Sequence, residues 1–231
     1  MNTPELESRL QASGLHLRGL LKITDEDISS LQLGIAEGTR IVLVGNIGSS
    51  YWPGFTRSPE YQDGLAHPLD RWSRRIGGCI ADEFGAKAVF PFDGPPYYPF
   101  QQWARRAESL KPSVMGLMIH PRYGLWHSYR FGLLMPDGAG LPKHQSFAQA
   151  SPCESCVTRA CLTTCPVGAF DVKGYDVDAC SHHLTKSPTA QCHSEGCLAR
   201  SACPVGIEYQ YDSEQHRFHL SAFLASRQAV D

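Results

Sequence analysis

The stretch CESCVTRACLTTCPVG, residues 153–168, places four cysteines within 13 positions and ends in Cys-Pro-Val-Gly. The same four-residue ending returns at 203–206, 38 residues further along the chain. Three more cysteines lie between the two endings, at positions 180, 192 and 197, so eight of the nine cysteines fall within 51 residues. A shared ending of this kind marks an internal repeat, which predicts two copies of one structural unit.

Clustered cysteines in a chain without a visible secretory signal are expected to bind metal rather than to form disulfides. Ferredoxins hold each 4Fe–4S cluster by closely spaced thiolates and one distant Cys-Pro, whose cysteine ligates the other cluster of the pair. The repeat therefore predicts two 4Fe–4S clusters. This pattern assigns one cluster to Cys153, Cys156, Cys161 and Cys203, and the other to Cys165, Cys180, Cys192 and Cys197.

Two structural zinc sites are the alternative, because zinc also takes four thiolate ligands. The gaps of four and five residues, before Cys161, Cys197 and Cys203, are longer than those of the simplest ferredoxin run. The two Cys-Pro endings favour iron–sulfur clusters. The ninth cysteine, Cys79, lies among apolar residues at helical spacing and is expected to be a buried small hydrophobic side chain.

Residues 1–145 read as a layered α+β domain. The continuous apolar run IVLVGNI at 41–47 predicts a strand that is buried on both faces. A helix is predicted from Pro68, which suits a first turn, to Gly85. Two further strands, at 114–120 and 126–135, are joined by a Pro-Arg-Tyr-Gly turn and predict a hairpin.

The rest of the chain is assigned to a small metal domain, residues 146–212, and to a tail, residues 213–231, with a helical pattern. A linker is expected at 136–142, PDGAGLP. The net charge of −2 argues against a broad basic face, so no nucleic-acid partner is expected. No membrane-spanning stretch and no signal peptide are visible, so we expect a cytoplasmic protein and no membrane partner.

Two segments resemble known families. The hairpin HPRYGLWHSYR, residues 120–130, resembles the His-Pro-Arg-Phe-Gly-Gly-Trp segment of the CblC family of cobalamin-processing proteins. The segment CSHHLT, residues 180–185, resembles Cys-Ile-Ser-Tyr-Leu-Thr in epoxyqueuosine reductases and reductive dehalogenases. The resemblance implies a nitroreductase-like, CblC-like α+β domain that holds a corrinoid, followed by a bacterial-ferredoxin-like dicluster domain.

The resemblance also implies a function, in which low-potential electrons pass from the two clusters to a bound cobalamin. The external electron donor would be a ferredoxin, a flavodoxin or a flavoprotein. Arg130 would bind an anionic group, either a small-molecule thiol or a corrinoid side chain. The remaining pocket residues would be His120, Tyr123, Gly124 and Trp126.

Two questions stay open at this point. The first is the role of the turn residues, because aromatic side chains at a turn also pack a hairpin without binding anything. The second is catalysis, because no acidic residue stands out as a proton donor, and Asp82, Glu83 and Asp93 are candidates only by availability. The alternative function is that of a ferredoxin-type electron-transfer protein without a corrinoid.

Overall fold

The computed structural model describes residues 3–27, 38–135, 150–171 and 174–228. The chain divides into two compact units. The first unit comprises residues 1–109 and 127–148, and the second comprises 110–126 and 149–231. The segment 110–126, which the sequence assigned to the first domain, therefore groups with the cysteine-rich part. The expected linker at 136–142 and the expected boundary near residue 145 lie outside the described residues.

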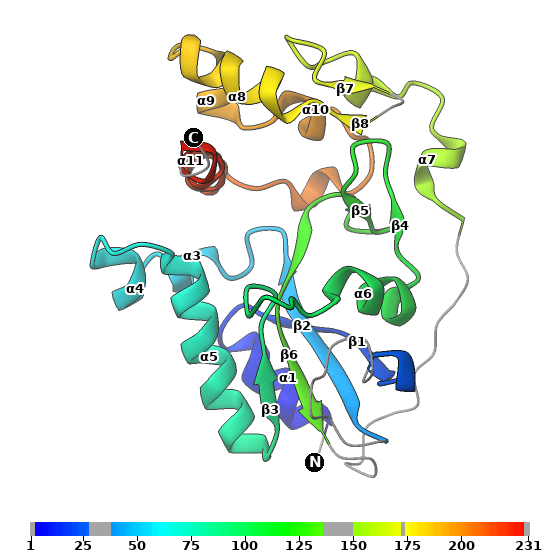
Figure 1. Ribbon diagram of the computed structural model, residues 1–231, viewed down its shortest axis with the longest axis vertical. Coiled ribbons are helices and arrows are strands. Elements are labelled where there is room, and N and C mark those ends of the chain that lie inside the picture. Colours follow the sequence, from blue (N-terminus) through cyan, green and yellow to red (C-terminus); the bar gives the residue numbers. More distant parts are fainter. Residues whose placement is uncertain (1–2, 28–37, 136–149, 172–173, 229–231) are drawn as a thin grey trace. The chain divides into compact units, whose positions relative to one another are not determined.

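The first unit is built on an antiparallel four-stranded sheet with the order β1-β2-β6-β3 (Figure 1). Its strands are β1 (His16–Lys22), β2 (Arg40–Ile47), β6 (His127–Met135) and β3 (Lys87–Val89). Strand β2 pairs with β1 on one side and with β6 on the other. Its six interior residues are all buried, which confirms the prediction from the apolar run.

Helices cover this sheet, so the mixed α/β character predicted from the sequence is confirmed. The helices that pack on it are α1 (Thr3–Gln11), α5 (Pro68–Phe84) and α6 (Phe100–Glu108), and two short helices, α3 (Trp52–Phe55) and α4 (Pro59–Gln62), precede α5. Helix α5 ends at Gly85, whose φ of 62° is left-handed, as expected for a glycine stop. It packs closely on the sheet at Gly77, where a Cβ atom would lie 3.0 Å from the rings of Phe90 and Phe131.

Cys79 is exposed, which corrects the expectation of a buried side chain. The buried face of α5 carries Trp72, Gly77 and Ile80. Successive residues of an α-helix are rotated by about 100°, so Cys79 lies off this face although it directly precedes Ile80. The spacing of apolar residues along a helix does not by itself show which of them lie at the edge of the buried face.

The predicted hairpin was wrong in its pairing. Strand β5 is only Met118–Ile119, and it pairs with β4 (Lys111–Pro112) in a separate small sheet. Strand β6 pairs with β2 and β3 instead. Residues 127–135 are apolar enough to form a buried strand with a neighbour on each side. Strand β6 therefore pairs with β2 and β3 and not with the strand that directly precedes it in the sequence.

The second unit consists mostly of short helices and strands. Its helices and strands are α7 (Pro152–Ser155), η1 (Ala160–Leu162), β7 (Phe170–Asp171), β8 (Gly174–Tyr175), α8 (Val177–Lys186), α9 (Gln191–Glu195), α10 (Leu198–Ser201), η2 (Ile207–Tyr209) and α11 (Ser213–Gln228). Helix α11 confirms the helical pattern of the tail. Within the described residues, no helix is long and apolar enough to span a membrane.

The core of this unit is formed partly by cysteines. Six buried side chains form its centre: Met115, Ile119, Leu125, Phe170, Ala199 and Cys203. Four more cysteines pack against them, at positions 153, 161, 165 and 197. Cysteine side chains therefore take part in the apolar packing of this unit.

Candidate metal centre

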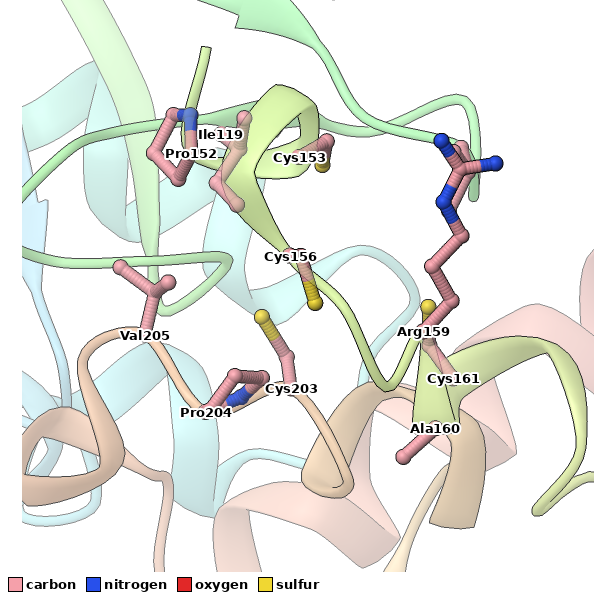
Figure 2. Close-up of a pocket in the computed structure, with 11 residues that line it drawn as sticks. Ile119, Pro152, Cys153, Cys156, Arg159, Ala160, Cys161, Cys203, Pro204 and Val205 are labelled. Carbon is pink, nitrogen blue, oxygen red and sulfur yellow. The ribbon is translucent and has the colours of Figure 1, made fainter.

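The structure brings four of the predicted ligands together in one pocket. Helix α7 and the turn after it supply Cys153 and Cys156, η1 supplies Cys161, and the segment after α10 supplies Cys203. Figure 2 shows the side chains of Cys156 and Cys203 pointing toward one another across this pocket. Cys203 belongs to the second repeat, so the pocket joins the two halves of the motif.

The other four cysteines also lie close enough to influence one another. Burial raises the pKa of the Cys180, Cys192 and Cys197 thiols above the ordinary value. The negative charge of Cys165 adds to this increase in each of the three pKa values. The set of Cys165, Cys180, Cys192 and Cys197 is therefore electrostatically connected.

The donor chemistry of the first set fits a positively charged metal group. Burial raises the pKa of Cys161, and the charges of Cys203, Cys153 and Cys156 raise it further. Thiolates packed this closely repel one another, and bound cations would offset that repulsion. Among the described residues, no group of three or more His, Cys, Asp or Glu side chains is arranged to hold a single metal ion.

Backbone amides point at several of the sulfur atoms. The amide of Ala169 donates to Cys165 Sγ at 3.3 Å. The amides of Val205, Arg200 and Leu198 bond in the same way to Cys203, Cys197 and Cys192 respectively, which lowers their pKa against the effect of burial. Such N–H···S bonds stabilise the charged thiolate, the form that ligates iron.

A pair of glycines holds the turn of residues 120–124 against the second Cys-Pro-Val-Gly ending. A Cβ atom on Gly124 would lie 1.9 Å from the carbonyl oxygen of Val205, and one on Gly206 would lie 2.4 Å from the carbonyl carbon of Tyr123. Both glycines have positive φ, 57° and 73°. Gly124 was predicted to line a corrinoid pocket, and its observed contact is with the backbone that follows Cys203.

The aromatic residues of the same turn also have partners inside the second unit. His120 Nδ1 accepts the amides of Arg122 and Tyr123 at 3.0 and 3.1 Å, and the His120 ring stacks on Tyr123 at 4.2 Å. Trp126 is fully buried. The guanidinium of Arg200 lies 4.4 Å from the Trp126 ring. These contacts build the unit, and none of these three predicted pocket residues lines the pocket of Figure 2.

Arg130, the fifth predicted pocket residue, belongs to the first unit on strand β6. It donates to Ser128 Oγ at 2.6 Å, and its guanidinium lies 5.9 Å from the Tyr51 ring. Burial raises the pKa of Asp70, and the nearby charge of Arg130 opposes that rise. In the part of the chain that the structure describes, the buried Nε atom of Arg130 has no hydrogen-bond partner.

Sequence reasoning missed a buried polar network in the first unit. Arg18 donates to both carboxylate oxygens of Glu108 at 3.0 Å, and the Tyr129 hydroxyl donates a very short hydrogen bond to the same carboxylate. Arg18 is also 3.3 Å from His127 Nδ1. Arg18 and Glu108 are 90 residues apart, and no spacing pattern in the sequence links them.

The acidic residues that the sequence offered as proton donors lie at the surface. Glu83 forms an ion pair with Arg9 at 2.9 Å, Asp93 forms one with Arg74 at 2.6 Å, and Asp82 is exposed. Ion pairs at the protein surface are common structural contacts and do not mark an acid catalyst. Burial raises the pKa of two other acids of this unit, Asp70 and Glu108.

Comparisons with known proteins find similarity among solved structures. No protein-family model matches the chain, and no curated protein matches it. The structure is similar to that of an epoxyqueuosine reductase solved with an epoxyqueuosine-modified tRNA-Tyr stem loop. Sequence identity is 16% and the TM-score is 0.49, over 92% of this chain and 69% of that one.

This finding corrects one expectation. The structure of that reductase contains a tRNA stem loop, so the exclusion of nucleic-acid partners does not stand. The net charge of −2 was the ground for that exclusion. Net charge argues against a broad basic face, but a local basic patch on a nearly neutral chain also binds phosphates.

Proposed function

We propose that the protein is an iron–sulfur oxidoreductase that holds two 4Fe–4S clusters and passes electrons to a bound acceptor. The observation that carries the proposal is the pocket in which Cys203 joins three cysteines of the first repeat. Cys165, although only four residues after Cys161, is not among the described residues that line this pocket. Crossed ligation of this kind is the ferredoxin arrangement.

The chain's own residues would position and tune the metal groups. When bound, the clusters supply single electrons at low potential. The amides that bond to Cys165, Cys192, Cys197 and Cys203 would stabilise their thiolates, and hydrogen bonds to sulfur are one determinant of cluster potential. The apolar core around Cys203 would exclude water from one side of its cluster.

Pairs of cysteine variants test the crossed division. Cys153→Ala combined with Cys203→Ala removes two ligands of one cluster, so we expect iron to fall from about eight to about four atoms per chain. Cys153→Ala combined with Cys165→Ala removes one ligand from each cluster and should lower iron below about four atoms per chain. Iron is measured on anaerobically purified protein, and Cys79→Ala is the control.

The opposite ranking of the two pairs would overturn the crossed division. If the first pair lost both clusters and the second pair lost only one, the ligands would be divided in chain order. Equal iron in every variant would show that these cysteines are not ligands. Cys79→Ala should keep its full iron content, because Cys79 is exposed on α5 of the first unit.

A corrinoid is the acceptor that we propose from the resemblance of residues 120–130. The buried Nε atom of Arg130 has no hydrogen-bond partner among the described residues. This supports a ligand that places an oxygen atom there to accept a hydrogen bond. The same proposal includes a nitroreductase-like fold for the first domain and a ferredoxin-like fold for the cysteine-rich domain. Ferredoxin-type electron transfer without a corrinoid is the competing function, and it is favoured by the structural contacts of His120, Tyr123 and Trp126.

A further inference from the structure

A second pocket of the second unit has the size and walls of a small-molecule site. Its volume is about 380 Å³, within the range of ligand pockets. Apolar side chains form most of its wall: Met115, Leu117, Phe170, Leu220 and Phe223. Phe170 stacks on Tyr175, another lining residue, at 4.5 Å with an interplanar angle of 11°, which presents flat aromatic surface.

Three nitrogen-bearing side chains converge on these apolar walls. Helix α10 contributes Arg200, and α11 contributes His216 and His219. None of the described lining residues is acidic. The pocket therefore combines aromatic surface with a positive charge and with groups that donate hydrogen bonds, which favours an aromatic ligand that carries an anionic oxygen.

Two of these side chains are fixed in place by their neighbours. The guanidinium of Arg200 lies 4.4 Å from the Trp126 ring and 4.6 Å from the Tyr211 ring, and it donates to the Leu125 carbonyl at 2.5 Å. The ring of His216 lies against Gly196, where a Cβ atom would come within 2.3 Å of Nδ1. A pre-positioned donor loses little entropy when a ligand binds.

Arg200 also has a hydrogen-bond donor that is not used within the described residues. Its Nε atom is buried and, among the described residues, has no hydrogen-bond partner, and no acidic side chain there forms an ion pair with it. A buried donor without an acceptor costs free energy, so an acceptor from outside the chain would be bound favourably. This observation is independent of the shape of the pocket.

We propose that this pocket binds a planar aromatic carboxylate, with the ring against Phe170, Tyr175 and Phe223 and the carboxylate toward Arg200. The inference goes beyond the proposed function, because it assigns a ligand site whichever metal the cysteines hold. Cys180 and Cys197 line the same pocket, so the ligand would lie directly beside the second set of sulfur atoms.

The test is calorimetric titration of 2-naphthoate into the full chain, purified anaerobically, with iron measured on the same sample. Leu220→Trp should fill the pocket and weaken binding by about tenfold or more. Ala222→Trp is the matched control, since Ala222 is exposed on the same helix, and it should bind like the wild type. Naphthalene-2-carboxamide, which lacks the charge, should bind more weakly than the carboxylate.

A second variant covers the case in which Leu220→Trp does not fold. His219→Leu replaces a hydrogen-bonding side chain of the pocket with an apolar one of similar size and should weaken 2-naphthoate binding without filling the pocket. The proposal is overturned if 2-naphthoate does not bind, or if it binds equally well to wild type and to folded pocket variants. Binding only to iron-free protein would also overturn it, because the pocket would then be the space of the metal group itself.

Failure of this proposal is distinguishable from failure of the proposed function. Iron-loaded protein that binds no 2-naphthoate contradicts only the ligand site. Protein that holds no iron but binds 2-naphthoate, with weaker binding in the Leu220 and His219 variants, would contradict the cluster proposal and support the ligand site.

Discussion

Gly168 and Gly206 occupy equivalent places in the two Cys-Pro-Val-Gly endings, and their surroundings differ. Both have left-handed φ angles, 61° and 73°. A Cβ atom on Gly168 would meet nothing within 4 Å, whereas one on Gly206 would lie 2.4 Å from the backbone of Tyr123. The repeat therefore conserves the turn geometry at both endings but uses it for close packing only at the second.

This difference predicts unequal costs for the same substitution. Gly168→Ala should lower the free energy of unfolding by about 1 kcal/mol, the strain of a left-handed alanine. Gly206→Ala should cost more than about 2 kcal/mol, because backbone atoms must also move. Denaturant unfolding of the two variants measures both values. Equal costs would show that the contact between 206 and the turn at 120–124 does not contribute.

Arg130 carries the prediction that concerns the corrinoid. Arg130→Ala should weaken cobalamin binding by about tenfold, because the positive charge and the unpaired Nε atom are lost together. Absorbance titration measures the affinity, and iron content should not change, since Arg130 lies in the first unit. Arg105→Ala, at an exposed site of α6, is the control. If both variants bound cobalamin with equal affinity, the role of Arg130 would be structural only.

Helices α4 and α5 are joined by a partly buried ion pair between Glu60 and Arg75. Arg75 donates to the two carboxylate oxygens at 2.5 and 2.9 Å. These hydrogen bonds lower the pKa of Glu60 from 4.5 to about 2. A carboxyl group whose pKa is lower in the folded protein stabilises the fold at pH values above its pKa in the unfolded chain. That stabilisation is lost as the pH falls from 4.5 toward 2.

Glu60→Gln should therefore lower the free energy of unfolding at neutral pH by about 1 kcal/mol, a modest value because the Arg75 side chain is 45% exposed. Wild type and variant should converge as the pH falls to about 2. Urea unfolding across this range measures the difference. Glu83→Gln, at the more exposed pair with Arg9, should change stability less. A difference that stays constant with pH would contradict the role of Arg75.

At the level of elements, the sequence predicted what depends on near neighbours. The buried strand β2, helix α5 with its glycine stop and the helix of the tail follow from local spacing, and the structure has all three. The 126–135 strand was found, but its partners were not, because pairing with β2 is set by residues some 90 positions away. Spacing also failed to show that Cys79 lies off the packing face.

At the scale of the whole molecule, the candidate site also combines features that the sequence predicted with contacts between distant residues that it did not. The repeat assigned Cys203 to the first set of sulfur atoms, and the structure places it in their pocket. The grouping of 110–126 with the cysteine-rich part was not visible, because it depends on contacts such as Gly124 with Val205, 81 residues apart. The Arg18–Glu108 pair was missed for the same reason.

The composition of the second unit gives the cluster proposal its physical basis. Five of its cysteines pack within or against a buried apolar cluster. Burial and the charges of neighbouring cysteines raise the pKa of Cys161 and Cys197, so a bound cation would be needed to favour the thiolate form that ligates metal. The metal would therefore be part of the fold as well as of the chemistry.

The most direct measurement is the metal and sulfide content of protein purified without oxygen. Two 4Fe–4S clusters require about eight irons and about eight acid-labile sulfides per chain, with no stoichiometric zinc. Zinc at about two atoms per chain without labile sulfide, or a protein with neither metal, would contradict the account.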